Sequence, residues 1–423
     1  MRAVRSILLL AALLSACAPG SRTTDPSPST TEPALSTAVA STLPVPPGTP
    51  RALTIWVPPD LSPDGSGEAA ILFAARLQAF DQAHPGVRVQ VRIKGRSGPA
   101  GMTEALAAAY QAAPSVLPDL AALDASELAS ATAAERITFW DDASSVPESW
   151  ALADAILASS RAGGGVAGLP FAAEADLFAY RATAYTEAPR TWTDLLTGST
   201  AFLFPLGDPT ARFTLGQYLA AGGRIRDADG APTLDRLALQ EVLSFYVAAR
   251  AGGLLPLTSR QHESSDTTGE ALLSGKIDAG LIAFTPFAAS APGDLLPVGP
   301  SPTGDGQGAC FVRAWTWALP SRPSGPEPLA VELARWLADP EFSGPWTRAL
   351  GLLPAGATAL GTWPEDDLTS LAGLLATRCA PLPTPDDLAR FGPILRQAAE
   401  AALTGELTPE AAASRAVLAL PRP

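Results

Sequence analysis

Residues 53–123 alternate short apolar segments with amphipathic ones, and this alternation limits the possible folds more than any other feature of the chain. Three segments have the composition of strands: LTIWV at 53–57, VRVQVRI at 87–93 and DLAAL at 119–123. Two segments repeat apolar side chains every three or four positions and predict helices: 68–83 and 102–113. Strands that alternate with helices form a parallel sheet covered by helices, so the sequence predicts an α/β fold.

The chain after residue 123 predicts a second unit of the same kind. Strands are expected at 168–181, 202–204 and 277–284, and helices at 208–223, 234–251, 327–350 and 386–416. In the helix at 208–223, Asp208 is expected as the N-cap and Pro209 as the first helical residue. The roughly 370 residues beyond position 50 exceed what one compact core usually holds, so two lobes are expected.

Two carboxylates interrupt the apolar segment GLPFAAEADLFAYR at 168–181. On a strand, Glu174 and Asp176 share a face and lie roughly 6.5 Å apart along it. Carboxyl pairs about 5 to 9 Å apart carry out glycoside hydrolysis. A sugar-cleaving enzyme is therefore the first hypothesis that this segment raises.

The N-terminus predicts export. Arg2 and Arg5 precede a short apolar stretch at 7–14, too short to span a bilayer and typical of a signal peptide. The LSAC ending at 14–17 resembles the lipobox of bacterial lipoproteins, which implies lipidation of Cys17 at the end of a 1–17 signal. Residues 18–50 are rich in Ser, Thr and Pro and predict a flexible tether that reaches roughly 30 Å.

Composition excludes several functions. A net charge of −13 argues against nucleic acid or anionic lipid head groups as partners. The two histidines, His84 and His262, lie far apart and no cysteine pair has ligand spacing, so no metal site is predicted. The chain has no Gly-x-Ser-x-Gly elbow, so no motif supports a serine hydrolase. The segment GEALLSGKI at 269–277 departs from a phosphate loop, and no cofactor is expected. Cys310 and Cys379 either form a disulfide or are two buried free thiols.

The order of these segments resembles the extracellular solute-binding proteins of family 1, the sugar-binding subunits of ABC importers. Six pieces carry the resemblance, in this order: LTIWV followed by FDQAHPGVRVQV, LPDLAALDASELA, GLPFAAEADLFAYRATAY, APRTWTDLL, LLSGKIDAGLIAF and ELARWLADPEFSGPWTRALGLLPA. The resemblance implies a two-lobed periplasmic-binding-protein-like fold of type II, each lobe a sheet flanked by helices. Residues 51–172 and 315–360 would form lobe 1, residues 176–310 and 361–423 lobe 2, and residues 173–175 and 311–314 the hinge crossings.

The resemblance also implies which residues contact the ligand. Glu174 would accept bonds from hydroxyls, and Asp176 would either do the same or cap a neighbouring amide. The alternative for both carboxylates is a solvated position at a lobe edge. Asp124 and Ser126 match a ligand-contacting loop after the third strand. Phe287 matches a position usually held by a stacking aromatic, and Phe391 lies near another. Trp56, Trp315 and Trp317 are further aromatic candidates, each with core packing as its alternative. Leu123 stands near the place where maltose-type binders have a stacking Trp, so the identity of the sugar is open.

The expected function is a substrate-binding lipoprotein of an ABC importer that captures a mono- or oligosaccharide between its lobes by hinge closure, without catalysis. Its expected partners are the ABC permease subunits and the small-molecule ligand, with membrane contact only through the lipid on the outer face of the cytoplasmic membrane. We expect a monomer. The alternatives are a lipid-anchored glycoside hydrolase that uses Glu174 and Asp176, and a sensor with the same closure. Polyols and polyamines remain alternative ligands.

Overall fold

The computed structural model describes residues 51–96, 98–112, 114–290 and 295–420. The predicted signal peptide, Cys17 and the whole predicted tether lie outside these residues, at positions 1–50. In the described residues, eleven strands form one mixed sheet, whose central order is β2-β1-β3-β11-β7-β9-β8. The predicted α/β class is confirmed.

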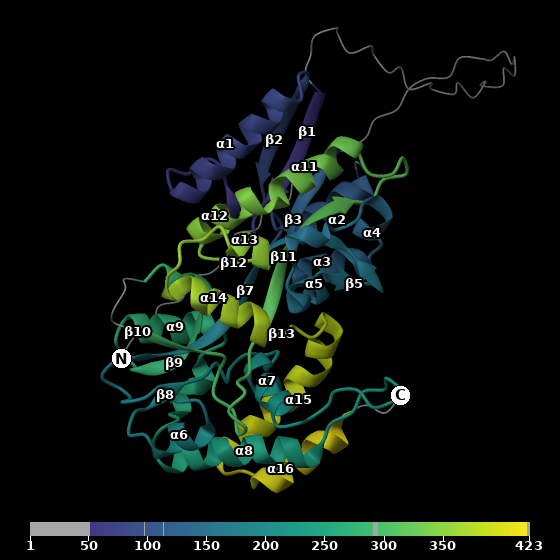
Figure 1. The fold of residues 1–423 in the computed structure, drawn as a ribbon. Helices are drawn as coiled ribbons and strands as arrows, with labels where there is room; N and C mark the ends of the chain where they lie inside the picture. Colours follow the sequence, from purple (N-terminus) through teal and green to yellow (C-terminus); the bar gives the residue numbers. More distant parts are fainter. Residues whose placement is uncertain (1–50, 97, 113, 291–294, 421–423) are drawn as a thin grey trace, which may run out of the picture. The chain divides into compact units, whose positions relative to one another are not determined.

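The first half of the sheet is parallel, as predicted. Strands β1 (Arg51–Val57), β2 (Val87–Ile93) and β3 (Leu120–Asp124) run in the same direction, with β1 in the middle. Helices α1 (Glu68–Ala83) and α2 (Met102–Ala112) form the crossovers between them (Figure 1). The carboxyl end of β3 leads directly into α3 (Ala125–Ala133).

Two long antiparallel strands, β7 (Gly168–Arg181) and β11 (Phe311–Pro320), join the two halves of the sheet. Strand β11 pairs with β3 along its second half, while β7 pairs with β9 (Ala279–Ala283) and β10 (Leu295–Gly299) along its own second half. The two predicted hinge crossings therefore face each other: Ala173, Glu174 and Ala175 pair with Ala314, Arg313 and Val312.

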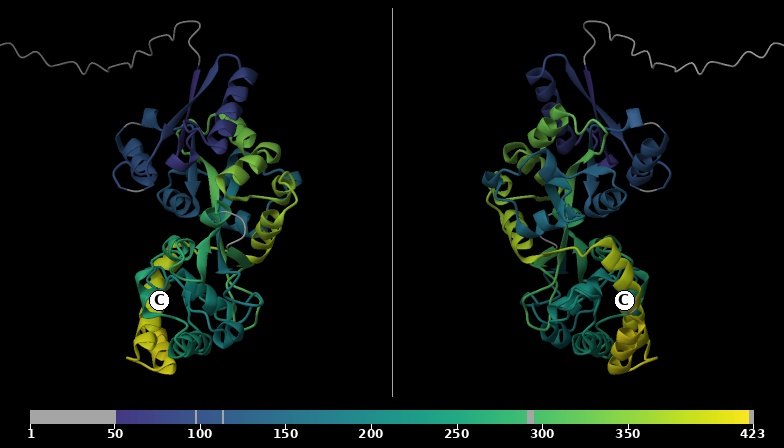
Figure 2. Two further views of the ribbon diagram at one scale, coloured as in Figure 1. Left: turned by 90° about the vertical axis from the view of Figure 1, so that its left-hand side faces the viewer. Right: turned by 90° about the vertical axis from the view of Figure 1, so that its right-hand side faces the viewer.

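Helices pack together in the second half of the chain. Helix α8 (Arg236–Ala251) lies against α15 (Pro385–Thr404) and α16 (Pro409–Ala419), and α7 (Arg212–Ala220) also contacts α8 and α15. The close packing of α16 on α8 is visible from three sides (Figures 1 and 2). The sequence at the C-terminus thus contributes to the same core as residues near position 240.

The remaining elements are short or peripheral. The helices are α4 (Trp140–Ala143), α5 (Asp154–Ser159), α6 (Trp192–Thr197), α9 (Ser265–Leu273), α10 (Phe284–Ala288), α11 (Pro328–Ala338), α12 (Pro340–Leu350), α13 (Ala357–Leu360) and α14 (Asp367–Arg378). The strands are β4 (Ile137–Thr138), β5 (Arg161–Ala162), β6 (Gly165–Val166), β8 (Phe202–Leu203), β12 (Leu353–Pro354) and β13 (Ala380–Pro381).

Separate hydrophobic cores stabilise the two halves of the central sheet. One contains a buried aromatic group in which Phe171 of β7 and Trp317 of β11 stack, with ring centroids 4.8 Å apart. Phe73 of α1 and Trp346 of α12 extend this group. The other core contains side chains of α7, α8, α15 and α16. Strands β7 and β11 contribute side chains to both cores.

Three predicted helix boundaries were wrong. The prediction at 327–350 covers two helices, because Pro340 forces Asp339 into an extended conformation between them. The prediction at 386–416 also covers two, because Gly405 adopts a left-handed conformation (φ 77°) after α15. The helix expected from Asp208 begins only at Arg212, and the Asp208 side chain instead accepts bonds from the Thr210 amide and hydroxyl.

The structure joins Cys310 and Cys379 in a disulfide. Cys310 lies just before β11 and Cys379 just before β13, which pairs with the start of β11.

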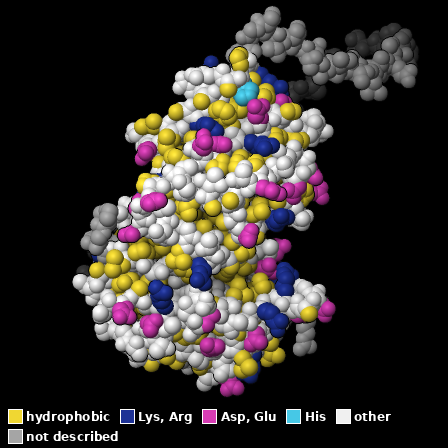
Figure 3. Space-filling view, in the orientation of Figure 1, with side chains coloured by type: hydrophobic (Ala, Val, Ile, Leu, Met, Phe, Trp, Pro, Cys, Tyr) yellow, Lys and Arg dark blue, Asp and Glu magenta, His cyan; other side chains and the backbone are white. Residues whose placement is uncertain are grey.

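No helix in the described part of the chain is long and apolar enough to cross a membrane. On the face shown in Figure 3, acidic and basic side chains are interspersed and form no single patch.

Candidate ligand-binding site

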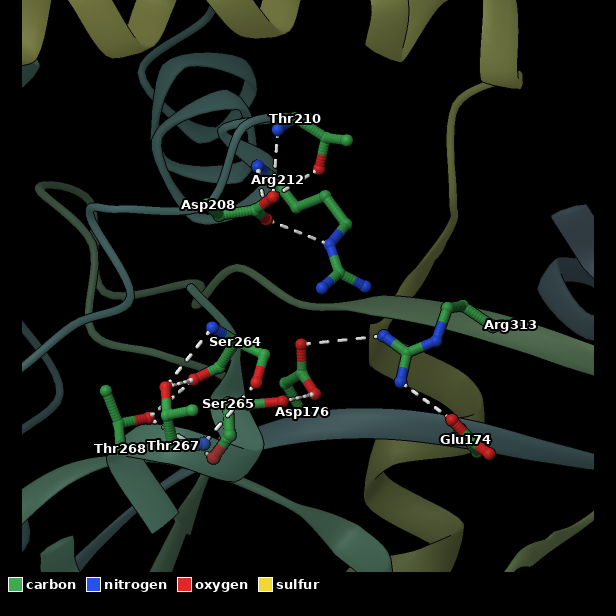
Figure 4. Close-up of polar contacts among 10 residues, drawn as sticks. All are labelled: Glu174, Asp176, Asp208, Thr210, Arg212, Ser264, Ser265, Thr267, Thr268 and Arg313. Atoms are coloured by element: carbon green, nitrogen blue, oxygen red, sulfur yellow. Dashed lines mark hydrogen bonds and ion pairs between the residues drawn. The ribbon is translucent and has the colours of Figure 1, made fainter. Parts of the chain in front are cut away.

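An ion triad occupies the paired middle of β7 and β11 (Figure 4). Arg313 Nη2 lies 2.9 Å from Glu174 Oε2, and Arg313 Nη1 lies 3.7 Å from Asp176 Oδ2. The strand register places Arg313 directly opposite Glu174, and the alternation of side chains puts Asp176 on the same face of β7. The three side chains are only 18–29% exposed. Mostly buried charges of this kind are stable only when they are paired.

Two neutral groups complete the hydrogen bonding of the carboxylates. The Trp315 Nε1–H donates to Glu174 Oε1 at 3.0 Å, and the Ser265 hydroxyl donates to Asp176 Oδ1 at 2.6 Å. Ser265 is the first residue of α9, where the Ser264 side chain caps the helix by accepting from the Thr267 amide. The cap therefore fixes the start of the helix that carries the partner of Asp176.

The charge state of the triad follows from its contacts. Burial alone would raise the pKa of Glu174, but the Arg313 guanidinium and the Trp315 N–H bond more than offset it and lower that pKa. Burial likewise opposes the charge on Arg313, while Asp176 and Glu174 raise its pKa above the ordinary value. A general acid for glycoside hydrolysis needs a carboxyl group with a raised pKa. Glu174 has the opposite shift.

A second group of charges lies where β3 ends. The Asp124 carboxylate caps α3 by accepting from the Ser126 and Glu127 amides at 2.8 and 2.9 Å, and the Glu127 carboxylate accepts from the Asp124 amide at 3.1 Å. Burial, and then the charge of Asp124, raise the pKa of Glu127 to about 7. Asp124 is paired with Trp315 across β3 and β11, and Trp315 bonds Glu174, so this capping box lies near the triad.

A third group comes from the opposite half of the chain. Arg212 at the start of α7 donates from Nε to Asp208 at 3.0 Å, and its guanidinium points toward Asp176 and Arg313 (Figure 4). Asp266, the second residue of α9, interacts electrostatically with Asp176, Arg313 and Arg212. Burial, and then Asp176, raise the pKa of Asp266. The triad is thus bordered by charged residues from both halves of the sheet.

The predicted aromatic residues lie in different environments. Trp56 and Trp315 are each 3% exposed, and a cation lies over each ring: Lys94 Nζ at 4.0 Å from the Trp56 centroid and the Arg96 guanidinium at 5.1 Å from that of Trp315. Phe287 on α10 is half-buried against the core around β9 and β11. Trp56 and Trp315 therefore offer little free face for stacking, whereas Phe287 is only partly covered.

Trp317 and Phe391 lie in the cores. Trp317 is fully buried in the aromatic group described above. Phe391 is fully buried on the inner face of α15, beside Leu388 and Leu395. Neither ring has an exposed face to present to a ligand. The core-packing alternative describes Trp317, whereas Phe391, expected near a stacking position at the ligand, is packed in the core.

The structure therefore brings together Glu174, Asp176, Trp315 and Asp124, with Ser126 exposed on the first turn of α3 beside them. Sequence reasoning missed Arg313, Ser265, Arg212 and Asp266. A signal for Arg313 was present, since it is the single charged residue in the apolar strand FVRAWTWALP. Glu174 and Asp176 likewise interrupt the apolar strand β7.

In the described ranges, no group of three or more His, Cys, Asp or Glu side chains is arranged to hold a metal ion.

Comparison with known proteins agrees with this architecture. The family described as bacterial extracellular solute-binding proteins matches residues 60–342. A search of curated proteins finds no match. The match covers well over half of the chain, which is enough to assign the protein to this family.

Several solved structures share the fold. Maltose-bound MalE3 of T. maritima is 18% identical, with a TM-score of 0.64, over 87% of this chain and 98% of that one. A cyclo/maltodextrin-binding protein complexed with maltotetraose is 20% identical, with a TM-score of 0.68, over 88% and 96%. The cyclic α-maltosyl-1,6-maltose binding protein of Arthrobacter globiformis is 18% identical, with a TM-score of 0.69, over 88% and 98%. This chain belongs to the bacterial extracellular solute-binding proteins and has their two-lobed α/β fold.

Proposed function

We propose that this protein captures a carbohydrate for an ABC importer and holds it beside the ion triad of β7 and β11. The observation that carries the proposal is the concentration of polar side chains on the paired middle of these two strands, between two apolar cores. Solved structures of the same fold were obtained with maltose and maltotetraose bound, which supports a sugar as the ligand class. The residues proposed to contact it are Glu174, Asp176, Asp124 and Ser126, with Trp315 and Arg313 holding the carboxylates in place.

The proposed mechanism is hinge closure without bond chemistry. Residues 51–172 and 315–360 would move as one lobe and residues 176–310 and 361–423 as the other, about the crossings at 173–175 and 311–314. A ligand that contacts both lobes stabilises the closed form more than the open one and so shifts the population toward it. The lowered pKa of Glu174 supports binding over catalysis, because the carboxylate remains an acceptor.

The proposed setting is the outer face of the cytoplasmic membrane. The family consists of extracellular proteins, so the chain acts outside the cytoplasm. Attachment through a lipid on Cys17 and delivery of the ligand to permease subunits by a monomer are the finer parts of the proposal. Mass spectrometry of the processed N-terminus would test the lipid, and copurification with the permease would separate an importer subunit from a sensor.

Thermal unfolding of the purified full chain tests the ligand class. A panel of mono- and oligosaccharides, polyols and polyamines is added at about 1 mM. A ligand bound with micromolar affinity stabilises the folded protein by about 4 kcal/mol and raises Tm by several degrees. A shift with a saccharide that is recovered intact supports the proposal. Cleavage of the saccharide, or a shift with polyamines alone, would refute it.

A further inference from the structure

A third segment of the chain lies beside the two predicted hinge crossings. Helix α14 contacts α5 and β12 of the first predicted lobe and β10 of the second. After α14 the chain passes through β13 and continues into α15, which belongs to the core of the second half. Residues 379–384, between α14 and α15, are therefore a third hinge segment.

Only a short backbone ladder pairs this third segment with β11. The Ala380 amide donates to the Cys310 carbonyl at 3.0 Å, and the Leu382 amide donates to the Val312 carbonyl at 3.1 Å. Pro381 stands between these two donors and has no N–H to donate. Both residues of β13 are exposed. Two hydrogen bonds at an exposed edge contribute little stability, so the ladder is weak by itself.

The Cys310–Cys379 disulfide joins the same two segments covalently. It links the residue before β11 to the residue before β13, although 69 positions separate the two cysteines in the sequence. Cys379 is 4% exposed and is packed in a hydrophobic cluster. The family is extracellular, and disulfides persist outside the cytoplasm. The bond therefore holds the third segment on β11 where the protein acts.

The disulfide and the ion triad act on opposite faces of β11. Val312 and Ala314 are buried in the hydrophobic cluster that contains Cys379. Arg313 stands between them, points to the other face and belongs to the triad. Cys310 is three residues before Arg313. A displacement of the start of β11 therefore also displaces the guanidinium that holds both triad carboxylates.

The same hydrophobic cluster contains side chains from both predicted lobes. Ile156 and Leu353 come from the first lobe and Leu177 and Ile282 from the second, and Leu375 of α14 packs in the same cluster. All five side chains are fully buried. A relative movement of the lobes changes how they pack, so α14 and the third segment must follow one lobe or the other. The disulfide makes the third segment follow β11.

We propose that the Cys310–Cys379 disulfide is a hinge staple, which makes the third segment bend together with β11 and so pre-organises the hinge for ligand capture. The proposal rests on the hinge closure proposed above and adds the device that restricts it. With the bond present, the third segment is already in place when the ligand binds. Without it, residues 379–384 separate from β11 in part of the population, and binding must order them again at a cost in affinity.

Hydrogen exchange followed by mass spectrometry tests the staple without a ligand. The full chain is compared with a double variant, Cys310→Ser with Cys379→Ser, and Cys17, the third cysteine, is present in both. The amides of Ala380 and Leu382 should exchange about ten-fold or more faster in the double variant. The amides of α8, which lies in the other core, should change much less.

Calorimetric titration tests whether the staple affects capture. Both proteins are titrated with the saccharides of the thermal-unfolding panel, including glucose, maltose and maltotetraose. Each saccharide that binds should bind the double variant about five-fold or more weakly. Val242→Ala, in the fully buried face of α8, is the matched control for lost stability. It should lower Tm as well, but leave both the exchange of residues 379–384 and the affinity unchanged.

Reduction separates loss of the bond from the change to serine. A water-soluble phosphine converts the disulfide to two thiols and is itself oxidised to the phosphine oxide, with oxygen from water. It should reproduce both changes in the original protein and have no effect on the double variant. An equal effect on both proteins would show that the bond is not the cause.

The possible failures are distinguishable. Unchanged exchange of residues 379–384 overturns the staple. Faster exchange with equal or tighter saccharide binding overturns its link to capture and leaves the carbohydrate function standing. If no saccharide of the panel binds the original protein, the carbohydrate function is refuted, and with it the role of the staple in capture.

Discussion

Strands β7 and β11 contain two adjacent regions of opposite chemistry. Phe171 and Trp317 belong to a buried aromatic group, whereas Glu174, Asp176 and Arg313, a few residues further along, form the ion triad. The aromatic group stabilises the fold by removing apolar surface from water. The triad contributes little net stability, because desolvation of its charges offsets their attraction. The same pair of strands thus provides both stability and a polar surface for ligand.

This contrast predicts different consequences for substitutions in the two regions. Changes in the aromatic group should lower stability and leave ligand affinity of the folded protein largely unaltered. Changes in the triad should affect both, because its carboxylates are the proposed acceptors. Three substitutions test the contrast, and a fourth, at Glu127, tests the charged group beside the triad.

Trp317→Ala should have the largest effect. The residue is fully buried and stacks with Phe171, and truncation of such a side chain costs about 4 kcal/mol or more. Urea unfolding followed by circular dichroism measures the loss. Ligand affinity, measured where the variant remains folded, should be within about two-fold of the original. A loss below about 1 kcal/mol would show that this region does not carry the stability assigned to it.

Arg313→Met should lower stability by about 3 kcal/mol, because it leaves Glu174 and Asp176 buried together without a cation. The triple variant with Glu174→Gln and Asp176→Asn should recover part of the loss but bind no ligand. Arg415→Met, which breaks an exposed pair with Glu406 at 2.9 Å, is the matched control and should cost less than about 1 kcal/mol. Equal losses in Arg313→Met and Arg415→Met would contradict the role of the triad.

Glu127→Gln should change the pH dependence of stability. The folded pKa of about 7 lies above the ordinary value of 4.5, so the folded state holds the proton more tightly than the unfolded state. Glu127 therefore lowers stability progressively as pH rises from about 4.5 to about 7, by up to about 3 kcal/mol. Unfolding curves at pH 5 and pH 8 should show that Glu127→Gln is more stable than the original protein mainly at pH 8. An equal difference at both values would refute the shift.

Ser265→Ala should have the smallest effect. It removes the 2.6 Å hydrogen bond to Asp176 and should cost about 1 kcal/mol. Ligand affinity should fall several-fold, because Asp176 loses the contact that orients it. Ser414→Ala, whose exposed hydroxyl bonds the Glu410 carbonyl within α16, should change neither quantity. Unchanged affinity in Ser265→Ala would show that Asp176 does not depend on this contact.

Much of the fold followed from local periodicity. The parallel unit of β1, β2 and β3 was predicted because strand-like segments alternate with helix-like segments in residues 53–123. This pattern can be recognised without the rest of the chain. The helix boundaries at Asp339 and Gly405 were missed although Pro340 and Gly405 mark them in the sequence. Phe391 was assigned to the ligand, yet it stands three residues after Leu388 and four before Leu395, the spacing of a buried helix face.

The site was less accessible to sequence reasoning, because it depends on register between distant segments. Glu174 and Arg313 are 139 residues apart and meet only because β7 and β11 pair in one particular register. The cation over Trp56 comes from Lys94, at the end of the neighbouring strand. Single charges within apolar strands were the available signal, and it was used for Glu174 and Asp176 but not for Arg313.

A crystal structure with bound sugar tests the central claim most directly. The full chain is crystallised with the saccharide that gives the largest shift in thermal unfolding. Ligand oxygen or nitrogen atoms should lie within about 3.2 Å of Glu174 or Asp176 and of Asp124 or Ser126. A ligand bound elsewhere, for example in the pocket of about 340 Å³ lined by Arg190, Gln307 and Arg378, with the triad uncontacted, would contradict it.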